Sequence, residues 1–177
     1  MGRKPARRGC RFLLFIADKL SRNILALPMP NRQILLVEDD PDCAHLAMVA
    51  FKQIIQSPSV HHVTDGAQAL DYLESQGEYA GRDSQPPTVV LLDLKMPRLN
   101  GFDVLERMRS LPTLRLQRVV VLSSSAHDRD VQRAYELGAS GYVVKSISFD
   151  TYCSSLKAIW EFFGVHNHPP HTSPSPA

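Results

Sequence analysis

Four short apolar runs, rich in β-branched residues, constrain the fold of this chain more than any other feature. The runs are continuous and do not alternate with polar residues, as is typical of strands buried on both faces of a parallel sheet. They are Ile34–Val37, Val89–Leu92, Val119–Leu122 and Tyr142–Val144. A fifth run, Val60–Val63, contains two histidines. This more polar composition predicts a strand at the edge of the sheet.

Longer amphipathic segments separate these runs, and each carries hydrophobic residues at helical spacing. The first segment has Pro41 in its opening turn, where a missing N–H costs nothing, and the second follows Asp65-Gly66. Gly101 starts the third segment, and Gly138 stops the fourth. The residues expected to face inward are Ala44, Ala47, Met48, Phe51, Ile54 and Ile55; Ala69, Leu70 and Leu73; Phe102, Leu105 and Met108; Val131, Ala134, Tyr135 and Leu137; and Phe149, Tyr152, Leu156, Ile159, Trp160 and Phe163.

Five strand–helix units in succession predict an α/β fold, a doubly wound five-stranded parallel sheet with helices on both faces and right-handed crossovers. Ligands of such sheets bind beyond the carboxyl ends of the strands. The residues at those ends are polar: the first strand runs into Glu38–Asp40, the third into Asp93, the fourth into Ser123 and the fifth into Lys145. We therefore expect a site at this edge.

Carboxylates that converge at one edge repel each other and need a cation. Hard oxygen ligands favour magnesium, Mg²⁺, with Asp39 and Asp93 as direct ligands and Glu38 in contact through water. Lys145 and Ser123 suit a phosphoryl group, because an ammonium neutralises one oxygen and a hydroxyl bonds another. Taken singly, each acid would be read as a helix N-cap or a solvated loop residue. Because these acids, the serine and the lysine all lie at one edge, we favour a metal and phosphoryl site.

Four blocks of the sequence resemble the signature blocks of the response-regulator receiver domain, of the CheY-like superfamily. The blocks follow one another in the family's order and spacing, and the resemblance covers residues 32–164. They are Ile34–Asp40, Leu91–Pro97 with Gly101, Val121–Ser123 and Gly138–Lys145. The resemblance implies a flavodoxin-like (βα)5 fold with strand order 2-1-3-4-5.

The resemblance also implies a role for each site residue. Asp93 would be the phosphoacceptor, taking a phosphoryl group from a phosphohistidine of a sensor histidine kinase. Glu38 and Asp39 would be the acidic pair that binds the metal, and Lys95 would lend the metal its backbone carbonyl. Lys145 would contact the phosphoryl group. The protein would then be no enzyme in the ordinary sense, since it would catalyse only its own phosphorylation and dephosphorylation.

Two further positions match the switch residues of the family. Ser123 stands where the family has Thr or Ser, and Tyr142 stands where it has its rotameric aromatic. In the implied mechanism the hydroxyl follows the new phosphoryl group, and Tyr142 then turns inward. Considered alone, Tyr142 would be read as a half-buried strand aromatic and Ser123 as a turn residue.

The sequence departs from the family pattern after the lysine, where Ser146 replaces the usual proline. Because a cis bond before a non-proline residue is costly, we expect a trans bond or a strained one. The Lys145-Ser146 pair, the long stretch Glu74–Pro87 and Asp71–Leu73 resemble the small stand-alone regulators associated with bacterial phytochromes. The implied kinase is therefore a bacteriophytochrome.

The ends of the chain differ from its body in charge and composition. Residues 1–30 carry seven Lys or Arg and one Asp, so they contribute +6 to the formal charge of +2, and the rest contributes −4. The acidic body weakens the hypothesis that the protein binds nucleic acid.

We expect residues 1–31 to be a disordered or untranslated leader, with Met29 as an alternative start, and residues 165–177 to be a disordered tail. The alternative for the leader is an amphipathic helix on a membrane or partner surface.

Membrane spanning and export are both disfavoured by the same leader. Its apolar stretch, 12–17, ends after six residues at Asp18. Six residues are too few for a signal peptide or a transmembrane helix. The three cysteines, Cys10, Cys43 and Cys153, are odd in number and lack metal-ligand spacing. Free thiols predict a cytoplasmic protein.

The chain has 32 residues after Lys145, and most of those up to residue 164 belong to the last helix. We therefore expect no DNA-binding or catalytic output domain. Output would come from altered binding of a downstream protein at the surface near Tyr142 and the fourth helix, or from passing the phosphoryl group onward. The resemblance allows a homodimer through that surface.

Two rival functions stay open at this point. One is a Mg²⁺-dependent phosphohydrolase with an aspartyl-phosphate, but such enzymes usually carry a second Asp two residues after the nucleophile, where this chain has Lys95. The other is a receiver-like binding module that is never phosphorylated. It is disfavoured because every residue needed for phosphorylation is present.

Overall fold

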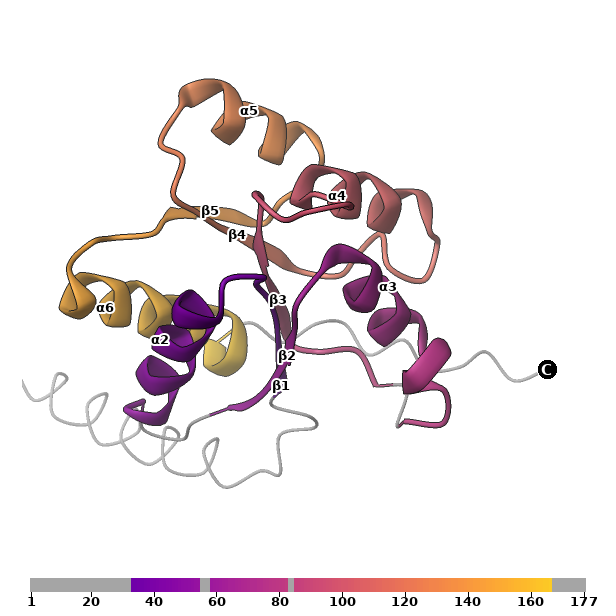
Figure 1. The fold of residues 1–177 in the computed structure, drawn as a ribbon, viewed down its shortest axis with the longest axis horizontal. Helices are drawn as coiled ribbons and strands as arrows, with labels where there is room; N and C mark the ends of the chain where they lie inside the picture. The colour runs from indigo at the N-terminus through magenta and orange to yellow at the C-terminus, as the bar shows by residue number, and fades with distance from the viewer. Residues whose placement is uncertain (1–32, 55–57, 83–84, 167–177) are drawn as a thin grey trace, which may run out of the picture. The chain divides into compact units, whose positions relative to one another are not determined.

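The computed structural model describes residues 33–54, 58–82 and 85–166. Its five strands form one parallel sheet in the order β2-β1-β3-β4-β5 (Figure 1). The predicted fold class and strand order are confirmed, and the histidine-containing strand lies at an edge as expected. The strands are β1 (Gln33–Val37), β2 (Ser59–Val63), β3 (Val89–Asp93), β4 (Val119–Ser123) and β5 (Gly141–Val144).

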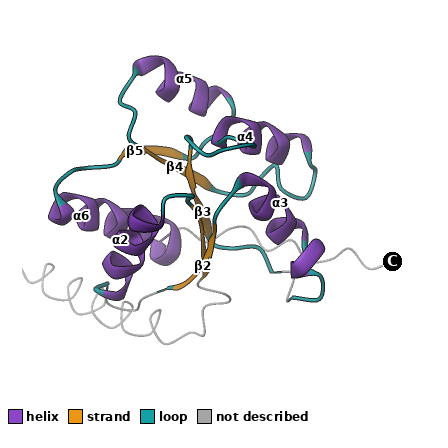
Figure 2. Cartoon of the chain, in the orientation of Figure 1, coloured by secondary structure: helices purple, strands orange, loops and turns teal. Residues whose placement is uncertain are grey.

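Helices cover both faces of the sheet. Helices α2 and α6 lie on one face, and α3, α4 and α5 lie on the other (Figures 1 and 2). A 3-10 turn, η1, follows α3, and a π-helical turn, η2, extends α6. The bounds are α2 (Pro41–Lys52), α3 (Gly66–Glu74), η1 (Gly77–Tyr79), α4 (Gly101–Ser110), α5 (Asp128–Glu136), α6 (Phe149–Trp160) and η2 (Glu161–His166).

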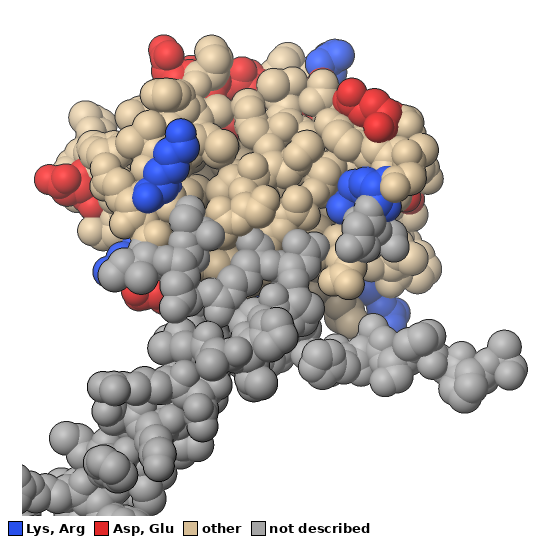
Figure 3. Space-filling view, turned by 90° about the horizontal axis from the view of Figure 1, so that it is seen from below, with Lys and Arg blue, Asp and Glu red and all other residues tan. Residues whose placement is uncertain are grey.

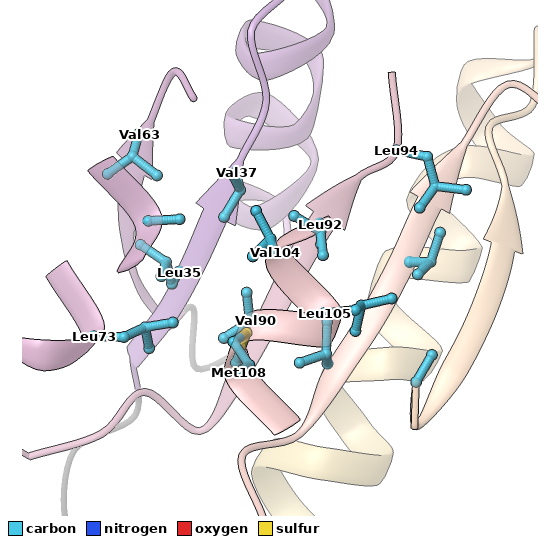
Figure 4. Close-up of a cluster of buried hydrophobic side chains, with 14 of the residues drawn as sticks. Leu35, Val37, Val63, Leu73, Val90, Leu92, Leu94, Val104, Leu105 and Met108 are labelled. Atoms are coloured by element: carbon cyan, nitrogen blue, oxygen red, sulfur yellow. The ribbon is translucent and has the colours of Figure 1, made fainter. Parts of the chain in front are cut away.

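The core consists of two layers, one on each side of the sheet. In β1, Ile34 and Leu36 join the layer beneath α2 and α6, whereas Leu35 and Val37 join the layer beneath α3, α4 and α5. This alternation follows from the two-residue period of a strand and explains why the run is continuously apolar. Figure 4 shows the second layer. The sheet is therefore fixed from both sides, and its carboxyl edge is held in place.

Helix α5 differs from the sequence prediction. Tyr135 is 51% exposed, although we expected it to face inward, and Ala134 is the one fully buried residue of this helix. Successive residues of an α-helix point about 100° apart, so Tyr135 turns away when Ala134 faces the sheet. Helix α2 also ends at Lys52, before Ile54, which packs against the core from beyond the helix.

The predicted leader, residues 1–31, and most of the predicted tail, residues 165–177, lie outside the described residues. So do Met29, Cys10 and Ile55, and the domain boundaries at 32 and 164 stay predictions.

Across the described ranges, the structure contains no helix with the length and apolar character that crossing a membrane requires. On the face shown in Figure 3, basic and acidic side chains are interspersed and do not gather into one basic patch.

Candidate functional site

Three carboxylates meet at the carboxyl edge of the sheet. Asp93 is the last residue of β3, and Glu38 directly follows β1, whose Val37 pairs with Leu92. One carboxylate oxygen from each of Glu38, Asp39 and Asp93 lies within 4.8 Å of the other two. Glu38 and Asp93 are buried, and Asp39 is half-buried. The structure thus brings together the acids that the sequence predicted as metal ligands.

The edge strand β2 fixes the backbone of Glu38 at both of its polar groups. The Glu38 N–H donates to the carbonyl of Val63 at 3.1 Å. The Glu38 carbonyl accepts a hydrogen bond of 2.8 Å from Nε2 of His62. Sequence reasoning missed this support, because it used the histidines of β2 only as a sign of an edge strand. The available signal for this hydrogen bond was the polar residue His62 in a strand next to the site.

Lys145 connects the two buried carboxylates. Its Nζ lies 2.6 Å from Oε2 of Glu38 and 3.4 Å from Oδ1 of Asp93. Burial raises the pKa of the Glu38 carboxyl, and the neighbouring ammonium offsets this only in part. Burial alone would lower the pKa of Lys145, but its hydrogen bond to Glu38 and the two negative charges raise it. The lysine therefore places a positive charge between the two buried acids.

The backbone around Lys145 is regular. Its N–H donates to the carbonyl of Ser123 at 2.8 Å, which continues the pairing of β5 with β4. The peptide bond to Ser146 is trans, as expected in the absence of proline. The serine in place of proline therefore leaves Lys145 within reach of both acids.

Asp40 plays a different role from its two neighbours. It is exposed and caps α2, accepting hydrogen bonds from the N–H groups of Asp42 at 2.8 Å and Cys43 at 3.0 Å. These bonds lower the pKa of Asp40. The helix N-cap interpretation therefore holds for Asp40 alone among the three consecutive acids. Lys95 is exposed in the loop after Asp93, and the role of its carbonyl stays a prediction.

The start of α4 packs tightly on the loop that carries Asp93. A Cβ added to Gly101 would lie 2.2 Å from the carbonyl oxygen of Asp93 and 2.8 Å from Cα of Leu94. The Gly101 N–H donates to the Leu94 carbonyl at 3.1 Å. The sequence marked Gly101 as a helix start, but this close approach depends on the loop conformation.

Of the two predicted switch residues, Ser123 lies at this edge and Tyr142 reaches the loop that follows it. Ser123 ends β4 and is fully buried, one residue beyond Leu122, which pairs with Asp93. Tyr142 is half-buried in β5, and its hydroxyl donates to the carbonyl of Ser125 at 3.0 Å. Ser123 is therefore on the strand next to Asp93, and Tyr142 reaches the loop that follows Ser123.

The donor set fits a hard divalent cation. The cluster combines three carboxyl groups with one lysine, a formal excess of two negative charges, in a mostly buried position. Their oxygens are the ligand type that Mg²⁺ and Mn²⁺ prefer, and no sulfur or imidazole ligand belongs to this cluster. The predicted cation is therefore compatible with the residues present.

Comparison with known sequences gives one consistent result. The family model for the response regulator receiver domain matches residues 34–157, which include all seven predicted site residues. The chain is 38% identical over 144 residues to the probable methanogenesis regulatory protein FilR2 of Methanothrix harundinacea, covering 81% of this chain and 88% of FilR2. It is 32% identical over 138 residues to the response regulator Rcp1 of Synechocystis, covering 76% of this chain and 90% of Rcp1.

Solved structures agree with this result. The phosphorylated cyanobacterial phytochrome response regulator RcpA superposes with a TM-score of 0.73 at 34% identity, over 80% of this chain and 99% of that one. The Mn²⁺-bound form of Rcp1 gives 0.68 at 32% identity, over 82% and 99%. The bacteriophytochrome response regulator AtBRR gives 0.66 at 39% identity, over 80% and 98%.

Proposed function

Because the chain belongs to the response regulator receiver domain family, we propose that it accepts a phosphoryl group on Asp93 in a Mg²⁺-dependent reaction and thereby changes which protein it binds. One observation carries this proposal: an Asp93 oxygen lies within 4.8 Å of an oxygen from each of two other carboxylates, and Nζ of Lys145 lies 3.4 Å from Asp93 Oδ1. Carboxylate nucleophile, cation ligands and phosphate-binding ammonium are thus assembled in a single site.

In this reaction an oxygen of Asp93 attacks the phosphorus of a phosphohistidine in line, the new O–P bond forms, and the P–N bond to the histidine breaks. A bound Mg²⁺ would supply charge stabilisation for the phosphoryl oxygens. Lys145 then shares its ammonium between the carboxylates and one phosphoryl oxygen. Glu38 and Asp39, together with Asp93 and the Lys95 carbonyl, are the groups that we propose to hold the metal.

The response to phosphorylation would begin at Ser123. Its hydroxyl is buried at the carboxyl end of β4, beside β3, where it can turn toward a phosphoryl group on Asp93. Tyr142 is already bonded to the loop after Ser123, so a movement of this loop changes the position of the ring. We propose this pair as the switch of the protein.

We propose a sensor histidine kinase of the phytochrome class as the phosphoryl donor, in the cytoplasm. The support is that RcpA is a cyanobacterial phytochrome response regulator and AtBRR a bacteriophytochrome response regulator. The described residues form one receiver fold without a DNA-binding fold. The output we propose is therefore binding of a downstream protein or of a second copy of this chain.

Two other functions receive less support. A phosphohydrolase would need a general acid beside the nucleophile, and Lys95 at the expected position is an exposed cation. A binding module without phosphorylation would not need three carboxylates close together with a lysine beside two of them. We therefore propose that catalysis by this chain is limited to its own phosphorylation and dephosphorylation.

Acetyl phosphate with Mg²⁺ provides the test. We expect intact-mass spectrometry to show one added phosphoryl group on the wild-type chain and none on Asp93→Asn. Asp128→Asn, which changes an exposed acid of the same type, is the matched control and should be labelled like the wild type. Equal labelling of Asp93→Asn would refute the assignment. Rapid turnover of small phosphate esters would support the hydrolase instead.

A further inference from the structure

Every polar group of Ser125 forms a hydrogen bond, and the partners lie in different parts of the molecule. Its N–H donates to Oγ of Ser123 at 3.2 Å, and its carbonyl accepts from the hydroxyl of Tyr142. Its own hydroxyl donates to Oδ2 of Asp130 in α5 at 2.6 Å. Ser125 is buried, so water does not compete freely for these groups. One residue therefore joins the site, β5 and α5.

Helix α5 is attached to the molecule differently from the other helices. In α2, α3, α4 and α6 the N-cap side chain bonds the first turn of its own helix; these N-caps are Asp40, Asp65, Asn100 and Ser148. The N-cap of α5, His127, makes no such side-chain bond. Instead its N–H donates to Oγ of Ser125 at 3.4 Å, and the same Oγ donates to Asp130. The start of α5 is thus fastened by Ser125.

The rest of α5 resists displacement only weakly. Ala134 is its one fully buried residue, whereas α2 and α6 each bury four. Arg133 lies over the ring of Phe102 at 4.4 Å and provides a further contact, with α4. Elements with few buried contacts need little free energy to shift. Helix α5 can therefore follow its attachment point.

We propose that Ser125 is a positioning residue that couples the state of Asp93 to the position of α5, through the hydrogen bond from its hydroxyl to Asp130. This inference rests on the proposed function. When the Ser123 hydroxyl turns to a phosphoryl group on Asp93, the Ser125 N–H loses its acceptor. The loop then rearranges, and Asp130 moves with Ser125 because a hydroxyl–carboxylate bond is among the stronger hydrogen bonds. Phosphorylation thereby shifts the first turn of α5 from its resting place and exposes its backbone N–H groups to exchange.

Hydrogen exchange measured by mass spectrometry tests this coupling on the full chain. Mg²⁺ with beryllium fluoride serves as a non-covalent phosphoryl mimic. In the wild type we expect the mimic to speed exchange in the first turn of α5 by at least about threefold and to change exchange in β5 as well. In Ser125→Ala the α5 response should disappear. The β5 response should remain, because the backbone carbonyl that accepts from Tyr142 is still present.

A conservative pair and a capping control separate coupling from simple loss of stability. Asp130→Asn keeps an acceptor for the Ser125 hydroxyl and should retain the α5 response, whereas Asp130→Ala should lose it. Ser148→Ala removes the N-cap of α6 and should lower stability while retaining the α5 response. A wild-type α5 response in Ser125→Ala, or its loss in Ser148→Ala, would overturn the inference.

The proposed function can fail separately from this inference. If acetyl phosphate labels the wild type but not Asp93→Asn, the proposed function is supported whatever the exchange data show. A labelled wild type whose α5 response survives in Ser125→Ala overturns the coupling alone. Absence of labelling in the wild type overturns the proposed function and, with it, the inference that rests on it.

Discussion

At the scale of single residues, Lys145 has two opposite effects on the site. Its ammonium lies beside Glu38 and Asp93, so it balances their charge and also competes with a cation for the same oxygens. A phosphoryl group, by contrast, benefits from every positive charge nearby. The same side chain should therefore weaken cation binding and speed phosphoryl transfer.

Lys145→Met should separate these effects. We expect the variant to bind Mg²⁺ roughly 10-fold more tightly, because a like charge within about 4 Å of the ligands is removed. We expect its labelling by acetyl phosphate at saturating Mg²⁺ to slow by roughly 100-fold. Calorimetric titration and the labelling rate measure the two quantities. Weaker Mg²⁺ binding by the variant would show that Lys145 does not compete for the acids.

A second prediction at the scale of single residues concerns the effect of Gly101 on stability. Its missing Cβ leaves room for the Asp93 carbonyl, so Gly101→Ala should force α4 away from the loop and lower the free energy of unfolding by roughly 1–3 kcal/mol. Gly141→Ala is the matched control, since its Cβ would meet the side chain of Val120 at an ordinary 3.6 Å. Urea unfolding measures both. Equal stability of Gly101→Ala and the wild type would contradict the close approach.

At the scale of elements, an aromatic cluster joins β2 to the segment after α3. His61 stacks on Tyr72 with centroids 4.3 Å apart, and Tyr79 closes the cluster edge-on. Arg82 lies 3.9 Å from the centroid of Tyr72. This cluster holds the long connection between α3 and β3 against the edge of the sheet.

The cluster makes stability depend on pH. Burial, followed by the charges of Arg82 and His62, lowers the pKa of His61. The unfolded chain therefore takes up a proton before the folded chain does, and stability is lost as the pH falls below about 6.5. His61→Phe keeps a ring on Tyr72 but cannot titrate, so it should lose less stability between about pH 7.5 and about pH 5.5.

Urea unfolding at the two pH values measures this loss. His45→Gln, which changes an exposed histidine of α2, is the control and should lose as much stability as the wild type. If His61→Phe loses as much as the wild type, the pH dependence arises elsewhere in the protein.

Local sequence predicted most elements of this fold because their signals are local. The buried strands were evident from continuous apolar runs such as Val89–Leu92, which both core layers enclose. Helix starts were evident where Pro41 or Asp65-Gly66 marks a first turn. Helical spacing failed for Tyr135, because in a short helix with one buried residue the spacing does not determine which side faces the sheet.

The sequence predicted the charged residues of the candidate site but not the hydrogen bonds that hold the site and its neighbouring loop in place. Asp93 and Lys145 each follow an apolar run, so a parallel sheet brings both to its carboxyl edge. The bonds from His62 to Glu38 and from Ser125 to Asp130 depend on the exact geometry of strand ends and loops. No spacing rule connects these pairs in the sequence.

At the scale of the whole molecule, the cluster of Glu38, Asp39 and Asp93 lies at the carboxyl edge of the sheet. Every proposed consequence, from the turn of Ser123 to the movement of α5, starts from modification of one carboxylate there. Asp39 and Glu38 lie close enough to Asp93 that labelling alone would not distinguish them. The central claim is therefore the identity of the modified residue.

Reduction of the acetyl phosphate-treated chain with borohydride tests this claim most directly, because borohydride converts an aspartyl phosphate to homoserine. After proteolysis and peptide sequencing by mass spectrometry, we predict homoserine at position 93, dependent on Mg²⁺ during labelling. Homoserine at position 39 or 40, or at position 93 to the same extent without a divalent cation, would contradict the account.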